Sequence, residues 1–216
     1  ALKADGFPVW SAPSFEADDL IASAALALTG PVVIVTADKA LLQLVADRVT
    51  VKSTRDGSLV DADAVKAKFG VLPSQMTDYL CLVGDASDNI RGAKGIGPKR
   101  AAELLTRFVS LQNIYTDLTD VGPAAMGLTP AVVTALRELE PRLTLTRTLV
   151  RLRTDAPIPL MDLDTPRTPP PMEDIVPETP EVTPEQNPTV VELTVDPAPT
   201  NGHTQQALAP SAPVVD

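Results

Sequence analysis

The most informative part of the sequence is GDASDNIRGAKGIGPKRAA, residues 84–102. Two acidic residues three positions apart, Asp85 and Asp88, precede a Gly-Ile-Gly-Pro turn that opens a predicted helix. Glycines let the backbone approach a phosphate closely, and free N–H groups at a helix start point at an anion. A helix-turn-helix corner with a solvated basic face is the weaker alternative. The residues predicted to clamp a phosphate backbone are Arg91, Lys94, Gly95, Gly97, Lys99 and Arg100.

A first acidic cluster lies upstream, at the start of a helix predicted over residues 14–29 with Ser14 as its N-cap. Glu16 and Asp19 share one face of this helix, with Asp18 beside them. Close carboxylates repel one another unless a divalent cation or the positive end of the helix compensates. Binding of a hard metal ion such as Mg²⁺ and plain stabilisation by the helix dipole are both open from this motif alone.

A second motif, Thr-Ala-Asp-Lys at residues 36–39, follows a β-branched run at residues 32–36. That run predicts a short strand buried on both faces, and Asp38 then lies just past its carboxyl end. Ligands of open α/β sheets bind at this edge. The alternative is that Asp38 caps a short helix at residues 40–46.

The remaining pattern predicts a small sheet followed by helices. A second strand is expected at residues 49–52. Only two strands are evident, so the sheet needs short strands near Val9-Trp10 or Leu59-Val60, or else residues that precede Ala1. Helices are predicted at residues 62–69 with Asp61 as cap and Gly70 as end, and at about 74–82, 99–108, 111–118 and 130–149, the last broken at Pro141.

Composition divides the chain near residue 156. Residues 157–216 hold 14 of the 22 prolines and none of the seven aromatic residues, and one Arg against ten acids gives them a charge of −9. We predict a disordered, acidic, proline-rich tail there, either solubilising or presenting polyproline II to a protein partner. Residues 1–156 carry 17 basic against 18 acidic residues, a charge of −1, so the net charge of −10 does not exclude DNA as a partner.

The small numbers of cysteine and histidine residues exclude several kinds of catalytic and metal site. A single Cys81 excludes an intramolecular disulfide framework and a Cys-rich zinc module. The single His203 falls in the predicted tail, which argues against a histidine relay or base in the folded part. The longest nearly apolar run, residues 20–28, is too short for a membrane helix, and the start lacks a signal-peptide pattern. We therefore predict a soluble, cytoplasmic protein.

Taken in order and spacing, the three motifs resemble those of the 5′ nuclease family. That family comprises the flap endonucleases and the 5′ to 3′ exonuclease domain at the front of bacterial DNA polymerase I. The resemblance covers about residues 7–155. It rests on Glu-Ala-Asp-Asp at residues 16–19, Thr-Ala-Asp-Lys at 36–39, and Gly-Asp-x-Ser-Asp-Asn at 84–89 followed by Gly-x-x-Gly-Ile-Gly-x-Lys at 92–99.

The fold that the resemblance implies is a partial Rossmann-like (PIN-like) α/β sheet followed by a helical subdomain with a helix-three-turn-helix, a form of helix-hairpin-helix. Residues 1–156 are then the carboxyl-terminal part of a nuclease domain. Within them, residues 1–72 form the α/β part and residues 73–156 the helical DNA-binding part, and the disordered tail follows at residues 157–216. The family's front segment, which carries two further acids, the first strand and a basic arch, has no counterpart in this sequence.

The activity that the resemblance implies is divalent-metal-dependent 5′ to 3′ exonuclease or flap endonuclease cleavage of DNA in replication or repair. Its substrate would be duplex DNA with a 5′ end, nick or flap. A turn like Gly95-Ile96-Gly97 would grip the backbone, with K⁺ often held by its carbonyls. Ala40 stands where the family commonly has an Asp, so a non-catalytic DNA-binding module with an incomplete metal site is the alternative. The residues matching ligands of two Mg²⁺ or Mn²⁺ ions are Glu16, Asp18, Asp19, Asp38, Asp85 and Asp88.

Overall fold

The structure, a computed structural model, describes residues 8–159. These residues belong to a compact unit, Ala1–Pro170, and a second unit comprises Pro171–Asp216. The predicted tail at residues 157–216, with its protein partner, lies almost wholly outside the described residues and stays a prediction. Within the described part, none of the helices has the length and apolar character required to cross a membrane.

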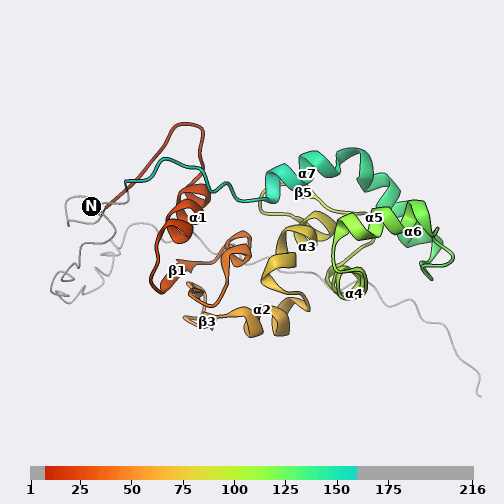
Figure 1. The fold of residues 1–216 in the computed structure, drawn as a ribbon, viewed down its shortest axis with the longest axis horizontal. Coiled ribbons are helices and arrows are strands. Elements are labelled where there is room, and N and C mark those ends of the chain that lie inside the picture. Colours follow the sequence, from red (N-terminus) through yellow and green to blue (C-terminus); the bar gives the residue numbers. More distant parts are fainter. Residues whose placement is uncertain (1–7, 160–216) are drawn as a thin grey trace, which may run out of the picture. The chain divides into compact units, whose positions relative to one another are not determined.

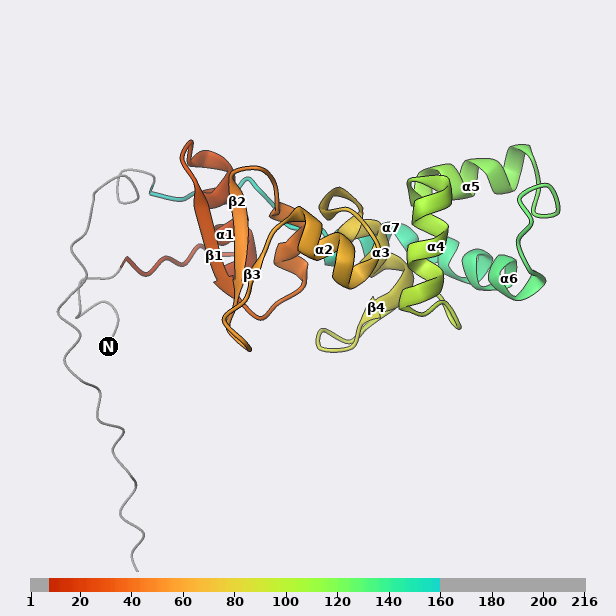
Figure 2. The same cartoon turned by 90° about the horizontal axis from the view of Figure 1, so that it is seen from below.

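The first part of the chain forms a small mixed sheet with the strand order β1-β2-β3. Strand β1 (Val32–Thr36) pairs in parallel with β2 (Val49–Ser53), which pairs antiparallel with β3 (Leu59–Val60). Helix α1 (Ala17–Ala27) precedes β1, and the short 3₁₀ helix η1 (Ala40–Leu44) connects β1 to β2. Figure 2 shows the three strands side by side. The predicted α/β arrangement is confirmed.

Two predictions about this part are wrong in detail. Helix α1 begins at Ala17, because Ser14 adopts a left-handed φ of 64° and Glu16 is extended. Strand β1 is not buried on both faces. Ile34 is buried, whereas Val33 and Val35 are 56% and 62% exposed, because no described element covers the face they share.

The question of the missing strands is answered only in part. Leu59–Val60 forms the third strand, as one alternative proposed, but residues 9–10 form none. A short edge strand of two residues extends the sheet only slightly, so β1 and β2 supply most of its hydrogen bonding.

The helical elements follow as predicted, with small shifts of their ends. Asp61 accepts a hydrogen bond from the N–H of Ala64 at 2.8 Å, and Gly70 ends α2 at a left-handed φ of 73°. Pro141 lies in a 3₁₀ turn that separates α6 from α7, which confirms the predicted break. The elements are α2 (Ala62–Phe69), η2 (Pro73–Gln75), α3 (Met76–Val83), α4 (Pro98–Phe108), α5 (Leu111–Asp120), α6 (Pro130–Leu139), η3 (Glu140–Arg142) and α7 (Leu143–Val150).

A tight hairpin that the sequence did not predict lies between α3 and α4. Its strands, β4 (Gly84–Asp85) and β5 (Ile90–Arg91), are only two residues long. A Cβ on Gly92 would lie 2.3 Å from the carbonyl oxygen of Leu82 and 2.5 Å from the N of Gly84. Only glycine allows so close a backbone approach, so this crossing sets the direction of the chain from β4 to α4.

One hydrophobic core joins the sheet to the helices. It includes Val51 of β2, Leu80 of α3, Leu105 of α4 and Leu136 of α6. Helix α3 packs against η1, α4 and α7 and so stands between the two parts. After α7 the chain runs back to α1 (Figure 1), a return that brings the end of the described part beside its beginning.

Candidate metal and DNA-binding site

Six carboxylates from three separate motifs line one small pocket. Its volume is about 100 Å³, which is room for a few water molecules or a hydrated ion but not for a nucleotide. The structure therefore brings together every acidic residue that the sequence singled out. They are Glu16, Asp18, Asp19, Asp38, Asp85 and Asp88.

Local structure explains how these side chains arrive there. The first three stand at the start of α1, where acids are stabilised by the helix dipole. Asp38 follows the carboxyl end of β1, the edge at which α/β sheets bind ligands. Asp85 is the last residue of β4, and Asp88 lies in the hairpin turn that follows it.

The acids repel one another. Burial and then the neighbouring charges of Asp38, Glu16, Asp19 and Asp88 raise the pKa of Asp18 to about 6. Burial and the charges of Asp85 and Asp38 also raise the pKa of Asp88. A cation in the pocket would relieve this repulsion.

Asp85 is the exception, because its negative charge is already compensated by protein groups. Its side chain is 2% exposed, and its Oδ1 accepts a hydrogen bond from the Nζ of Lys39 at 2.7 Å and another from the backbone N of Ser87 at 3.1 Å. Burial would raise the pKa of Asp85, but the hydrogen bonds from Lys39 and Ser87 outweigh it and hold that pKa below its usual value. We assigned no role to Lys39 from the sequence, although it stands next to Asp38 in the second motif.

Two other carboxylates are held by backbone N–H groups. The Oδ1 of Asp38 accepts from the N–H of Ala40 at 2.7 Å, but the N-cap of η1 is Lys39, so the helix-capping alternative for Asp38 is not confirmed and Asp38 also lines the pocket. Asp19 accepts from Glu16 at 3.2 Å and from Arg153 at 2.8 Å, one bond to each oxygen. These bonds fix the direction of both side chains.

The donor set suits a hard divalent cation. Carboxylate oxygens are the ligands that Mg²⁺ and Mn²⁺ prefer, and the mutual repulsion of the acids is what such an ion offsets. Within residues 8–159, however, no three His, Cys, Asp or Glu side chains are yet gathered closely enough to hold an ion. Side chains can line one pocket without lying close enough together to coordinate one ion. Acidic side chains would therefore have to rotate when a metal ion binds.

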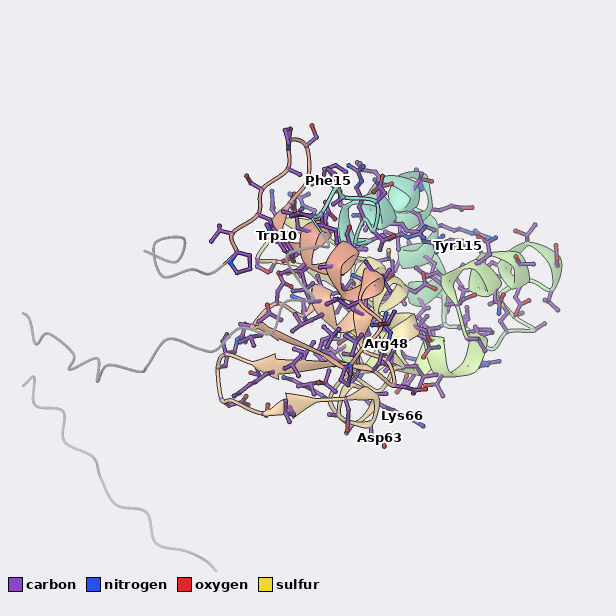
Figure 3. The ribbon with its side chains drawn as sticks, turned by 60° about the vertical axis from the view of Figure 1, so that its left-hand side comes forward. Trp10, Phe15, Arg48, Asp63, Lys66 and Tyr115 are labelled. Carbon is purple, nitrogen blue, oxygen red and sulfur yellow. The ribbon has the colours of Figure 1, made fainter. Side chains whose placement is uncertain are left out.

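The far wall of the pocket comes from the end of the described chain. Residues 149–152 line it, and the N–H of Arg153 bonds to Asp19 of α1. The guanidinium of Arg153 also lies 3.9 Å from the centre of the Phe15 ring, whose place before α1 is seen in Figure 3. No local sequence signal could have found this wall, because its residues are more than 120 positions from α1.

The predicted phosphate clamp opens α4. Gly95 adopts a left-handed φ of 81°, and Pro98 is the first residue of the helix, as the sequence indicated. The side chain of Ile96 is only 3% exposed and packs in the core, so this residue can offer a ligand only its backbone. The charged side chains of the clamp, Arg91, Lys94, Lys99 and Arg100, are all exposed. Arg100 contacts Glu103 at 3.4 Å.

Arg142 holds the loop that leads into the clamp. Its two guanidinium nitrogens donate to the carbonyl oxygens of Arg91 and Gly92 at 2.7 and 2.6 Å. This forked contact ties η3 to the loop that leads into α4, and we did not anticipate it from the sequence because the partners are about 50 residues apart. The loop is thus positioned by tertiary contacts.

Comparison with known proteins identifies two adjoining family models in the chain. Residues 1–70 match the 5′-3′ exonuclease N-terminal resolvase-like domain, and residues 71–173 match the 5′-3′ exonuclease C-terminal SAM fold. Together they cover most of the sequence. The two models adjoin between residues 70 and 71.

Curated relatives carry corresponding names. DNA polymerase I of Deinococcus radiodurans is 46% identical over 117 residues, which are 53% of this chain and 12% of that one. The 5′-3′ exonuclease of Buchnera aphidicola is 30% identical over 160 residues, which are 73% of this chain and 56% of that protein. Flap endonuclease Xni of Shewanella amazonensis is 37% identical over 148 residues, which are 67% of this chain and 56% of that protein. The chain thus spans little more than half the length of the last two and a small fraction of the first.

Solved structures agree with the fold. A mutant of T5 5′-exonuclease is 25% identical, with a TM-score of 0.59 over 68% of this chain and 60% of that one. A T5 protein co-crystallised with metal ions gives the same identity and TM-score over 68% of this chain and 55% of that one. Two adjoining models, named relatives and shared architecture lead to one conclusion: the chain belongs to the 5′-3′ exonuclease family.

Proposed function

We propose that this chain carries the metal-binding and DNA-gripping part of a 5′ to 3′ exonuclease or flap endonuclease that hydrolyses phosphodiester bonds of DNA in replication or repair. The observation that carries the proposal is the convergence of six carboxylates on one pocket. Membership of the 5′-3′ exonuclease family supports it. The expected substrate is a duplex with a 5′ end, nick or flap.

The acids have distinct parts in this proposal. Asp18 and Asp88, whose negative charges are poorly compensated, would bind Mg²⁺ or Mn²⁺ most directly, with Glu16 beside them in the same pocket. Asp38 keeps one oxygen beyond its bond to Ala40, and Asp85 is held ionised by Lys39. A bound divalent ion would supply Lewis-acid polarisation of the phosphodiester and activation of water.

The DNA would be held by its backbone. Lys94, Lys99 and Arg100 present charge without any side chain shaped to read a base, so binding should be independent of sequence. The carbonyl groups of the Gly95–Gly97 turn are the proposed place for a K⁺ ion, as the family resemblance implies. Arg142 would hold this turn in position through its contacts with Arg91 and Gly92.

The test is cleavage of a labelled 5′-flap duplex in Mg²⁺ or Mn²⁺ by the chain and by the Asp85→Asn/Asp88→Asn variant. We expect metal-dependent cutting that falls by at least about 10²-fold in the variant, while DNA binding is kept or tightened because two charges that repel phosphate are gone. Weaker DNA binding by this variant would contradict the metal assignment.

The competing proposal is a DNA-binding module that does not cut. It is favoured by Ala40, which adds no ligand to the pocket, and by the absence of a ready ligand cluster among residues 8–159. Salt-sensitive binding of flap duplex with no cleavage in either metal would select it. An Ala40→Asp variant that then gained cleavage would locate the deficit in the pocket itself.

A further inference from the structure

We infer that a second DNA-backbone contact lies in a basic groove that runs from the α/β part to α4 and is defined by Arg55, Lys68, Lys99 and Arg107. The inference rests on the proposed function and extends it beyond the clamp at the start of α4. Neither Arg55 nor Lys68 belongs to any of the motifs that identify the family. The groove is built from two cavities that share residues.

The first cavity, of about 470 Å³, lies beside the acidic pocket. Arg55 and Lys68 line it together with the hydroxyl-bearing residues Thr36 and Ser53. Asp38 lines both this cavity and the acidic pocket, so the two are neighbours. Cationic side chains with hydroxyl donors among them suit phosphate oxygens.

The second cavity, of about 610 Å³, lies between the end of α2 and α4. Its basic residues are Lys68, Lys99 and Arg107. Lys68 and Phe69 line both cavities, which therefore meet at the end of α2. The two cavities therefore form one continuous surface, which leads from Asp38 to α4, the helix that carries the proposed clamp.

The charges of the groove are available to a ligand. Across residues 8–159, none of its four basic residues takes part in an ion pair. Two neighbouring acids have other partners: Glu103 contacts Arg100, and hydrogen bonds from Ser58, with a smaller contribution from the charge of Lys68, lower the pKa of Asp56 to about 2. All four basic residues are exposed.

A nucleic acid backbone fits this arrangement better than a single small anion. The basic residues are spread over two adjoining cavities, and the path connects two sites that we have already assigned to DNA. A polymer that repeats one phosphate per nucleotide can engage them in succession. No aromatic side chain other than Phe69 lines either cavity, so stacking with bases contributes little there.

The chain offers a matched control on the same two segments. Lys52 of β2 and Lys66 of α2 are exposed but line neither cavity, because alternate strand residues face opposite sides and Lys66 lies on another face of its helix. Figure 3 shows Lys66 pointing outward beside Asp63. Lys52→Gln/Lys66→Gln removes the same charge as Arg55→Gln/Lys68→Gln without touching the groove.

The experiment measures binding of two unrelated labelled nicked duplexes by fluorescence anisotropy, with EDTA present so that cleavage cannot intervene. Salt is varied between about 50 and 200 mM. We expect Arg55→Gln/Lys68→Gln to bind both duplexes roughly tenfold more weakly at low salt and to lower the slope of log K against log salt by about 1.8, since each phosphate contact contributes about 0.9. The control should stay within about twofold of wild type.

Four double variants separate the possible failures. If the control pair loses as much DNA affinity as the groove pair, or if the groove pair loses none, the proposed groove is wrong, because neither result depends on the residues that line the two cavities. If Lys94→Gln/Arg100→Gln alone weakens binding, the groove is wrong while the proposed function stands; if wild type fails to bind DNA, the proposed function fails as well. Recovery of binding in Arg55→Lys/Lys68→Arg would support the groove and exclude a folding defect.

Discussion

At the scale of single residues, the acidic pocket contains two kinds of carboxylate. Asp85 is compensated by Lys39 and Ser87, so it stays ionised without a cation. Asp18 is surrounded by like charges and is partly buried, so ionisation costs the folded state free energy. The same repulsion that favours metal binding must therefore destabilise the metal-free protein.

This difference predicts a pH dependence of stability that depends on Asp18. Because its folded-state pKa is raised from 3.8 to about 6, the folded state binds a proton more readily, and stability falls as pH rises through that interval. Asp18→Asn removes the loss. In EDTA at pH 8 the variant should melt about 2 to 4 °C above wild type, which corresponds to about 1 kcal/mol after allowance for solvent screening.

Thermal melts followed by circular dichroism from pH 4 to pH 8 test this prediction. The advantage of the variant should shrink as pH falls from 8 and be small at pH 4, where Asp18 is protonated in the folded state and about half protonated in the unfolded state. Added Mg²⁺ should stabilise wild type more than the variant, since the variant has lost a ligand. A constant difference across the pH range would show that repulsion at Asp18 is not its cause.

At the scale of elements, the hairpin β4–β5 decides how the acidic pocket and the clamp are spaced. It carries Asp85 on one strand and leads through Gly92 to the turn before α4. The crossing of Gly92 over the end of α3 leaves no room for a side chain. Arg142 then holds the same loop from η3.

Gly92→Ala should accordingly be costly. Its Cβ would meet backbone atoms of Leu82, Val83 and Gly84 at 2.3 to 2.5 Å, and backbone cannot move aside as a flexible side chain can. We expect a loss of about 3 kcal/mol in the free energy of unfolding, measured by urea denaturation. Gly30→Ala is the control, because nothing lies within 4 Å of its added Cβ; similar losses in both variants would refute the close-crossing argument.

At the scale of the whole described molecule, the return of the chain after α7 closes the acidic pocket. The N–H of Ala156 donates to the hydroxyl of Ser23, which is 4% exposed in α1, at 3.0 Å. Arg153 bonds to Asp19 and packs on Phe15. These contacts join segments that are more than 130 residues apart in the sequence.

Ser23→Ala should loosen this closure. It leaves the N–H of Ala156 buried without its acceptor, at a cost of about 1 to 3 kcal/mol. Hydrogen–deuterium exchange should rise in α1 and at residues 151–156 while α6 stays protected. Thr148→Val, which removes only a hydrogen bond within α7, should leave exchange in α1 unchanged; faster exchange there in both variants would argue against a specific closure.

The sequence by itself determined most elements and the identity of the acids. The Asp61 cap, the Gly70 end, the Pro141 break and the β-branched run of β1 act through neighbouring residues, so their effects can be read locally. The acidic motifs indicated hard-metal chemistry because their residue types and spacing limit the ligands available. These inferences needed no knowledge of distant contacts.

The contacts between these parts follow from the tertiary structure and could not be predicted from the sequence. The tertiary structure exposed Val33 and Val35, paired Lys39 with Asp85, placed Arg142 on the clamp and brought Arg55 and Lys68 to the border of the acidic pocket. Each of these outcomes depends on which segments pack side by side. Contacts between residues tens of positions apart arise from burial of a shared core and leave no periodic or local pattern in the chain.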